Sequence, residues 1–329
     1  MAGVAVEYLK NDEGKAGAMT TGLWTHEAFT GHVTPPGHPE QVARMAAVTR
    51  ALSAPGFDGL TRFEAPLCDD TALLRCHPQG YIDRIVAAEP ETGWRQLDAD
   101  THMSPGSVAA ARRAVGGALA AVDAVLAGTV TNGFVAARPP GHHAERETPM
   151  GFCLFGTVAI AAKHALDHHG LARVAVVDFD VHHGNGTQDL LWNEARAIFF
   201  SSHQSPLWPG TGTEDERGAH GTIHNLPLAP DSDGTAMRRV YEERVFPAIR
   251  AHRPDLILVS AGFDAHRADP LAQLRWETDD YAWLTERLVG LAAELCAGRL
   301  VSVLEGGYDL DALGDSAAAH VAGLMRGAA

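Results

Sequence analysis

The stretch Val174-Ala-Val-Val-Asp-Phe-Asp-Val-His-His-Gly-Asn-Gly-Thr187 decides the fold of this chain. It opens with four apolar residues, three of them β-branched, and this pattern predicts a strand buried on both faces. Ligand-type side chains follow at its carboxyl end, where Asp178, Asp180 and His182 are spaced by two and share one face of an extended chain. Open α/β sheets place their sites at the carboxyl ends of strands, so this face is a candidate metal site. An ordinary polar turn between a strand and a helix is the alternative.

Three further apolar segments are predicted to be buried strands that end in chemically useful side chains: 134–137, 255–264 and 300–308. After the first, Pro139-Pro-Gly141 predicts a rigid turn that holds the adjacent imidazoles of His142 and His143, a pair suited to proton transfer. The second ends in Asp264, a natural third metal ligand, and the third ends in Tyr308 after two glycines that let the chain bend. Two aspartates and one histidine leave an open coordination position, which is typical of a catalytic metal site. Taken singly, each of these residues would be a cap, a turn or a packing residue.

Two loops supply candidate pocket walls. In the first, Gly151 lets a ligand approach the backbone closely, and the ring of Phe152 could form a wall. In the second, Trp208 lies in a proline- and glycine-rich segment, as expected of a pocket rim. Packing in the core is the ordinary alternative for both aromatic residues.

The remaining pattern predicts helices and loops without chemistry. Apolar residues at helical spacing predict several helices, one of them interrupted by a proline. The segment 20–39 is expected to be a loop, and its three histidines are expected to have surface or packing roles. The predicted helices are 40–52, a helix with its start at Ser104-Pro105 and its end before Gly128, 157–169, 236–251 with a kink or break at Pro247, and a helix capped by Thr278.

Composition places the chain among globular proteins. It has 329 residues, of which 46% are hydrophobic and 20% charged, and no repeat or linker divides it. We therefore expect one large α/β domain over residues 19–329. Residues 11–15 are polar and turn-like, and residues 1–18 as a whole are expected to be an extended or artificial start without function. The net charge of -15 argues against nucleic acid as a partner and suits a cationic substrate.

The four cysteines show neither the density of a disulfide framework nor paired spacing. A reducing, cytoplasmic setting is therefore expected. The sequence has no apolar run of membrane-spanning length and no signal-peptide pattern, so no membrane partner is expected.

Six motifs of the chain resemble those of the zinc-dependent histone deacetylase family, and they follow one another in the same order as in that family. The resemblance runs from about residue 20 to the end of the chain. It implies the arginase-deacetylase fold, in which helices flank both faces of a central, mostly parallel sheet. Asn185, where class I members carry aspartate, resembles the class II branch and its bacterial relatives, the histone deacetylase-like and acetylpolyamine amidohydrolases. The motifs are 138–145, 151–153, 178–188, 209–212, 261–264 and 305–308.

The resemblance implies two metal sites. Asp180, His182 and Asp264 would hold Zn²⁺. Asp178, Asp180, His182 and Ser201 would form part of a second, structural site for a monovalent cation, K⁺.

The resemblance also assigns catalytic roles. His143 would be the general base, and His142 would be its electrostatic partner, oriented by Asp178. Tyr308 would donate a hydrogen bond to the oxyanion. Asn185 would orient His143 without stabilising its cation, which should make His143 less basic than in class I members.

Five residues would contact the substrate. Phe152 and Trp208 match the aromatic residues that line the tunnel for an acyl-lysine stem. The carbonyl of Gly151 would accept the amide N–H, and Gly306 would lie beside the substrate. Leu271 resembles a leucine of lysine-deacetylating members, where the polyamine-selective relative carries an acid.

The sequence therefore predicts a zinc-dependent amidohydrolase that acts on small-molecule or peptide N-acyl amines, with acyl-lysine ranked above acetylpolyamine. A homo-oligomer is compatible with this prediction. An arginase-like enzyme with two manganese ions is a rival, but the segment Asp180-Val-His182 lacks a second acid at the required spacing. A non-catalytic sensor of acylated ligands is another, although the presence of His142, His143 and Tyr308 speaks against it.

Overall fold

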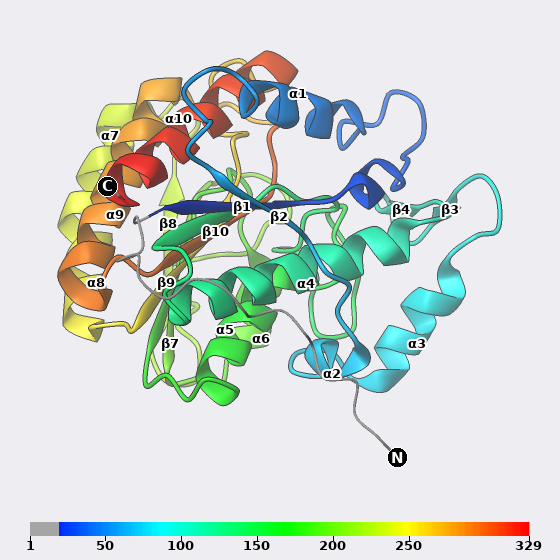
Figure 1. The fold of residues 1–329 in the computed structure, drawn as a ribbon, viewed down its shortest axis with the longest axis horizontal. Helices are drawn as coiled ribbons and strands as arrows, with labels where there is room; N and C mark the ends of the chain where they lie inside the picture. Colours follow the sequence, from blue (N-terminus) through cyan, green and yellow to red (C-terminus); the bar gives the residue numbers. More distant parts are fainter. Residues whose placement is uncertain (1–19, 329) are drawn as a thin grey trace, which may run out of the picture.

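The computed structural model describes residues 20–328, so the expected extension at 1–18 lies outside the described residues. Within the described range, one sheet contains eight strands in the order β2-β1-β5-β10-β9-β6-β7-β8 (Figure 1), and every neighbouring pair is parallel. This arrangement confirms the predicted α/β class. The strands of the sheet are β1 (Thr21–Thr25), β2 (Thr61–Glu64), β5 (Asn132–Val135), β6 (Val174–Asp178), β7 (Ala197–Gln204), β8 (Ile223–Leu228), β9 (Leu256–Ala261) and β10 (Leu300–Leu304), and a separate hairpin contains β3 (Arg95–Gln96) and β4 (His102–Met103).

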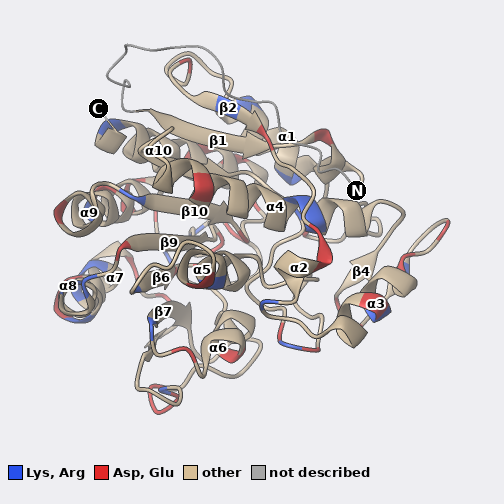
Figure 2. Cartoon of the chain, turned by 60° about the horizontal axis from the view of Figure 1, so that its bottom comes forward, with Lys and Arg blue, Asp and Glu red and all other residues tan. Residues whose placement is uncertain are grey.

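Helices cover both faces of the sheet (Figures 1 and 2). On one face, α4 contacts β1, β5 and β10, and α5 contacts β6 and β9. On the other face, α10 contacts β1 and β5, and α9 contacts β9. Helix α1 packs against α10, and helix α8 packs against α9. The helices are α1 (Ala43–Ala51), α2 (Asp70–Leu73), α3 (Gln79–Ala88), α4 (Ser107–Leu126), α5 (Thr157–Asp167), α6 (Asn185–Leu191), α7 (Gly234–Val240), α8 (Phe246–His252), α9 (Thr278–Cys296) and α10 (Leu310–Ala328), with short 3₁₀ and π-helical segments at Glu27–Thr30 and Tyr241–Val245.

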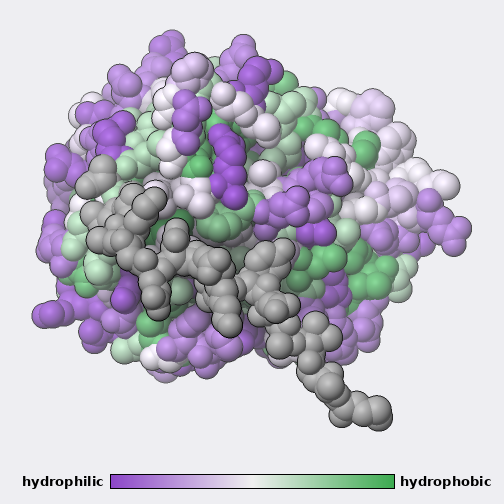
Figure 3. Space-filling model, viewed as in Figure 1, coloured by the Kyte–Doolittle hydropathy of each residue, from purple (hydrophilic) through white to green (hydrophobic). Residues whose placement is uncertain are grey.

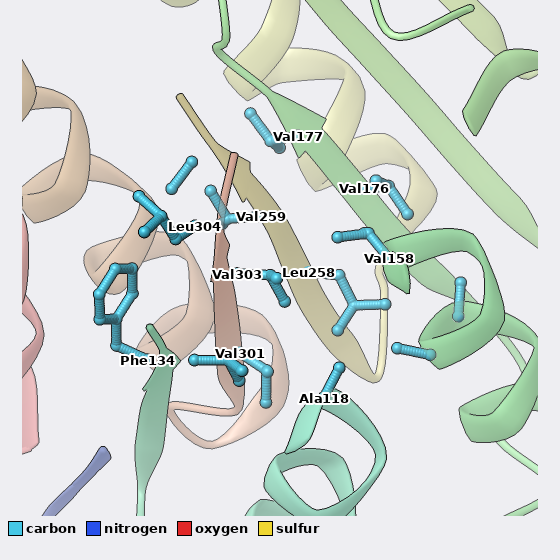
Figure 4. Packing of buried hydrophobic residues seen from close by; sticks show 14 of the residues in the cluster. Ala118, Phe134, Val158, Val176, Val177, Leu258, Val259, Val301, Val303 and Leu304 are labelled. Carbon is cyan, nitrogen blue, oxygen red and sulfur yellow. The ribbon is translucent and has the colours of Figure 1, made fainter. Parts of the chain in front are cut away.

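The central strands read as apolar runs because helices bury them on both sides. Figure 4 shows Val176, Leu258 and Val301 from three of these strands packed with Val158 and Ala118 from the helices. Each of these side chains is buried, and burial of a valine or leucine side chain stabilises the fold by about 1.5–3 kcal/mol. The core therefore gives the carboxyl ends of the strands a rigid base.

The expectation of a loop over 20–39 is wrong for its first part, because β1 occupies Thr21–Thr25 between β2 and β5. Gly22 and Gly133 leave room for the ring of Trp24, with which a Cβ at either glycine would collide. The ring also stacks on Phe63 with the ring centroids 4.7 Å apart. These contacts with neighbouring strands stabilise a segment that is too short and glycine-containing to be read as a strand locally.

Several helix starts differ from the prediction. Helix α1 begins at Ala43 rather than at 40, and α7 begins at Gly234 rather than at 236. Helix α4 begins at Ser107, and its N-cap is Gly106 with a φ of 94°, so Ser104-Pro105 precedes the helix. Helix α9 begins at Thr278, but its N-cap is Glu277, which forms a capping box with Asp280. The predicted break at Pro247 is confirmed, because a π-helical turn separates α7 from α8 and Pro247 lies in the first turn of α8.

The surface carries most of the charge. Lysine, arginine and acidic residues lie mainly on the helices and loops around the sheet (Figure 2), and hydrophilic residues are spread over the face shown in Figure 3. All four cysteines are free, as their spacing predicts. No helix within residues 20–328 is both long and apolar enough to cross a membrane.

Candidate active site

The four predicted site loops meet at one edge of the sheet. Strands β5, β10, β9 and β6 are parallel neighbours in this order, so their carboxyl ends lie side by side. The chain passes from β5 to β6 and returns later to fill the gap with β9 and β10. Such a change in strand order opens a crevice at the carboxyl ends, where α/β proteins bind their ligands.

The predicted metal ligands form one buried group. Ligand atoms of Asp180, His182 and Asp264 all lie within 4.8 Å of one another. Nδ1 of His182 is 3.2 Å from Oδ1 of Asp180 and 3.2 Å from Oδ2 of Asp264. The backbone N–H groups of Gly306 and Val181 donate to the other oxygens of the two carboxylates, at 2.8 Å each. These bonds hold the carboxylates in place, and a Cβ on Gly306 would collide with both of them.

The electrostatics of this group fit a bound dication. Burial, together with the nearby charge of Asp180, raises the pKa of Asp264 to about 7. Burial alone would lower the pKa of His182, but the two carboxylates raise it to about 10. A proton on this imidazole lies between the carboxylates, where a metal ion would replace it. Two carboxylates and one imidazole are also donors that zinc accepts in catalytic sites.

The two histidines predicted to be catalytic are buried beside this group, and each has its own partner. Nδ1 of His142 lies 2.9 Å from Oδ2 of Asp178, and Nδ1 of His143 lies 2.7 Å from Oδ1 of Asn185. The amide nitrogen of Asn185 donates to Oε1 of Glu145 at 2.8 Å, so the amide oxygen faces His143. Nδ1 of His143 therefore donates to Asn185, and its Nε2 remains a proton acceptor.

The surroundings of the two imidazoles shift their pKa values in opposite directions. Burial alone would lower the pKa of His142, but the carboxylates of Asp180 and Asp178 raise it well above its ordinary value. Burial lowers the pKa of His143 well below its ordinary value, and positive charge on His142 and His182 acts in the same direction. Neutral His143 is suited to accept a proton, and cationic His142 is suited to stabilise negative charge.

Glu305 holds the histidine loop, a role that the sequence analysis missed. Its Oε2 accepts hydrogen bonds from the backbone N–H groups of Gly141 at 2.6 Å and His142 at 3.2 Å. The hydroxyl of Ser260 donates to Oε1 at 3.2 Å. Burial raises the pKa of Glu305 to about 7. An acid at the carboxyl end of a buried strand was the available sequence signal.

Tyr308 is held by contacts on two sides. Its N–H donates to Oδ2 of Asp269 at 2.7 Å, and the guanidinium of Arg44 lies 5.0 Å from the centre of its ring. The same guanidinium donates to the carbonyls of Glu305 and Gly307. Burial raises the pKa of Tyr308 well above its ordinary value, so the phenol stays protonated and able to donate.

A pocket of ≈ 510 Å³ opens onto this edge of the sheet. Seven residues of the predicted site line it: His143, Gly151, Phe152, His182, Trp208, Leu271 and Tyr308. Of these, Leu271 lies in the loop after β9. Gly306, Asp180 and Asp264 are buried next to the pocket, joined by the hydrogen bond from Gly306 to Asp180.

The pocket wall is aromatic, as predicted, but contains residues that the sequence analysis set aside. The ring of Trp208 lies 4.8 Å from that of His143, and Trp208 is 40% exposed, which suits a rim. His38, expected to have a surface or packing role, lines the pocket with its ring centre 4.8 Å from that of Phe152. His102 also lines it, from the hairpin strand β4, for which the sequence had no clear signal.

The residues expected at a monovalent-cation site lie together. Asp178 and Ser201 are register partners on β6 and β7, and both are buried. Oγ of Ser201 accepts a hydrogen bond from the N–H of Gly184 at 3.3 Å. Binding of K⁺ there stays a prediction.

Comparison with known proteins identifies the family of this chain. Residues 38–324 match the family described as the histone deacetylase domain. The solved structure titled "Crystal Structure of HDA15 HD domain" superposes with a TM-score of 0.89 at 31% sequence identity, covering 94% of this chain and 89% of the other.

Two curated relatives are similar over most of their length. Histone deacetylase 14, chloroplastic, of Arabidopsis thaliana is 40% identical over 90% of this chain and 74% of its own. The histone deacetylase-like amidohydrolase of Pseudomonas aeruginosa is 39% identical over 84% of this chain and 75% of its own. The resemblance seen in the motifs is thus confirmed. The chain belongs to the histone deacetylase family, whose members include deacetylases and amidohydrolases, and it is an enzyme that hydrolyses amides.

Proposed function

We propose that this enzyme is a zinc-dependent deacetylase that hydrolyses the amide bond of N-acyl-lysine-type substrates. One observation carries the proposal: a proton acceptor, His143, and a hydrogen-bond donor, Tyr308, line the same pocket as His182 of the Asp-His-Asp group. An amide in this pocket would therefore meet a base, an oxyanion donor and the metal ligands at once.

Asp180, His182 and Asp264 would hold the zinc ion. When bound, zinc makes water acidic enough to attack an amide at neutral pH and polarises the amide carbonyl. Nε2 of His143 takes the proton of the attacking water and later delivers it to the leaving amine. His142, kept cationic by Asp180 and Asp178, stabilises the negative charge that develops beside it.

The other pocket residues hold the substrate. The phenol of Tyr308 donates to the oxygen of the former carbonyl, and this bond strengthens as charge develops there. The carbonyl of Gly151 accepts the amide N–H. Phe152 and Trp208 contact the alkyl stem and exclude water from the reacting groups.

Acetylpolyamine is the second candidate substrate, and one observation favours it. The pocket wall includes the carboxylate of Asp100, which could bind a cationic amine. Leu271, an apolar residue of the same wall, favours the alkyl stem of lysine. The enzyme's net charge of -15 suits either cationic substrate.

We also propose that Asp178, Asp180, His182 and Ser201 contribute oxygen ligands to a structural K⁺ ion. The support is the adjacent, in-register placement of Asp178 and Ser201 in the sheet. Activity measured with K⁺ replaced by a large organic cation tests this assignment, and equal activity in both would contradict it.

The decisive experiment measures turnover of acyl-lysine peptides and acetylated polyamines by metal-free enzyme, by enzyme reloaded with zinc, and by reloaded His143→Ala enzyme. We expect turnover only with zinc and a near-complete loss in His143→Ala. Cleavage of acetyl-lysine peptides above polyamines supports the substrate assignment, and the reverse order replaces it. Zinc binding without turnover of any substrate would exclude the proposed activity.

A further inference from the structure

A second cluster of histidines lies at the carboxyl end of α5. His164, His168 and His169 each offer one ring nitrogen, and these nitrogens lie within 4.8 Å of one another. The first turn of α5 adjoins the catalytic loop, because a Cβ on Gly141 would meet the backbone of Thr157. The helix has 11 residues, which corresponds to a length of roughly 16 Å. The cluster is thus at the opposite end of α5 from the active site.

Helix geometry brings the three rings together. His164 and His168 are four residues apart on the same helix face, and their rings are stacked with centroids 4.8 Å apart and planes at 13°. His169 meets both rings edge-on, at 5.1 Å and 4.9 Å. Two histidines at this spacing on a helix are an arrangement that binds zinc.

A carboxylate from the neighbouring helix completes the cluster. Oδ1 of Asp123, in the last turn of α4, lies 2.7 Å from Nε2 of His164 and 2.7 Å from Nε2 of His169. Partial burial would raise the pKa of Asp123, but hydrogen bonds and charge from these two imidazoles lower it below its ordinary value. The carboxylate is therefore ionised, and it fixes the orientation of both rings.

We propose that His164, His168 and His169, supported by Asp123, form a second metal site for a borderline divalent ion such as Zn²⁺. Imidazole is a preferred ligand of zinc, copper and nickel, and a carboxylate bonded to ligating histidines is a recurring feature of such sites. The side chain of His164 is 9% exposed and that of His169 is 26% exposed, so an ion can reach the cluster from solvent while one ligand is held in the core. A bound ion would join the end of α4 to the end of α5.

A simple ion-pair network is the alternative explanation. It accounts for His164 and His169, which bond to Asp123. It does not account for His168, which among the described residues has no ion pair with Asp123 and yet packs its ring against both other imidazoles. The position of His168 is what a three-imidazole metal site requires.

The first test counts zinc. Metal-free wild-type enzyme, the double variant His168→Ala/His169→Ala and the control His220→Ala are titrated with Zn²⁺ by calorimetry, and bound zinc is measured after gel filtration. All three substituted side chains are exposed, so the variants should fold. We expect the double variant to bind one equivalent less than the wild type and the control. Equal stoichiometry in all three proteins would overturn the proposal.

The second test identifies the ligands with Cu²⁺ as a probe. The active-site group, with His182 as its one imidazole, accounts for one equivalent of Cu²⁺ in both proteins. In the electron paramagnetic resonance of wild-type enzyme, a second equivalent of Cu²⁺ should show hyperfine coupling to several ring nitrogens, and the double variant should lose this second signal. Asp123→Asn should keep the signal but weaken binding about tenfold to a hundredfold, as expected of a residue that orients ligands. An unchanged copper signal in the double variant would assign the copper to another site and overturn the proposal.

Discussion

Nδ1 of His143 lies 2.7 Å from Oδ1 of Asn185, and the amide of Asn185 is itself held by Glu145. The contact fixes the tautomer of His143 without adding negative charge beside it. Asn185→Asp should therefore raise the pKa of His143, because a carboxylate favours the imidazolium form.

The expected result of Asn185→Asp is an acid limb of the pH profile of kcat/KM that moves to higher pH by about one unit or more. A raised pKa keeps the base protonated, and thus inactive, up to a higher pH. The profile of Asn193→Asp, a substitution outside the pocket lining, is the control. If the acid limb of the Asn185→Asp profile stays at its wild-type pH, the group whose pKa sets this limb is not His143.

Tyr308→Phe should lower kcat roughly a hundredfold to a thousandfold with little change in KM, because only the hydroxyl that donates to the developing oxyanion is lost. The ring keeps its contact with Arg44, so the fold should be unaffected. Tyr281→Phe is a matched control, since the buried hydroxyl of Tyr281 has no hydrogen-bond partner among the described residues. Steady-state kinetics of both variants, reloaded with zinc, test this expectation, and equal losses would refute it.

Gly306→Ala should weaken zinc binding and activity together. A Cβ at this position would collide with the carboxylates of Asp264 and Asp180, which would have to move apart. Gly290→Ala, in α9, is the control because a Cβ there meets nothing within 4 Å. Zinc affinity measured by competition with a chelator should fall for the first variant and be unchanged for the second. A wild-type affinity in Gly306→Ala would show that the carboxylates are not tightly placed.

Arg138→Met should lower the free energy of unfolding by about 3–5 kcal/mol. It removes hydrogen bonds from the buried carboxylate of Glu40, which keeps only Arg44 as an arginine partner, and it leaves the carbonyls of Phe29 and His32 without this donor. Arg138 bonds both oxygens of Glu40, and both side chains are fully buried. Arg196→Met removes ion pairs with Asp167 and Glu194 in which the arginine is 43% exposed, and its cost should stay below about 1 kcal/mol. Denaturant unfolding of the two variants compares these costs directly, and similar values would contradict the argument.

His320 should make the enzyme less stable as the pH falls. Burial lowers its pKa to about 3, whereas the unfolded state binds the proton near pH 6.5. The sign follows from the folded pKa being depressed: stability is complete above pH 6.5 and is lost progressively toward pH 3, by about 1.4 kcal/mol per pH unit.

His320→Gln should remove this share of the pH dependence. Glutamine can still bond Ser302 or Thr285, the two hydroxyl partners of the imidazole. The slope of unfolding free energy against pH should fall by the amount due to one proton between pH 6 and pH 4. Burial also lowers the pKa values of His77 and His203 to about 4 and that of His183 to about 3, so these histidines should contribute to the slope that remains. An unchanged slope in His320→Gln would show that His320 is already protonated in the folded state.

Much of the site could be predicted from local pattern. Asp180, His182 and Asp264 follow apolar runs that only buried strands explain, and parallel strands bring their carboxyl ends to one edge. The Pro-Pro-Gly turn likewise confined His142 and His143 to the end of a strand. The first strand could not be predicted in this way, because the ring of Trp24 packs into the room that Gly22 and Gly133 leave on β1 and β5 and stacks on Phe63 of β2.

The sequence by itself determined the fold class, the family and the candidate catalytic side chains, because periodicity and motif spacing are local properties of the chain. Only the tertiary structure decided which distant residues meet. It placed Arg44 against Tyr308, Glu305 under the histidine loop, His38 in the pocket wall and Asp123 beside the histidines of α5. These contacts depend on the path of the whole chain through space, since helix packing and strand order bring together side chains that no local pattern connects.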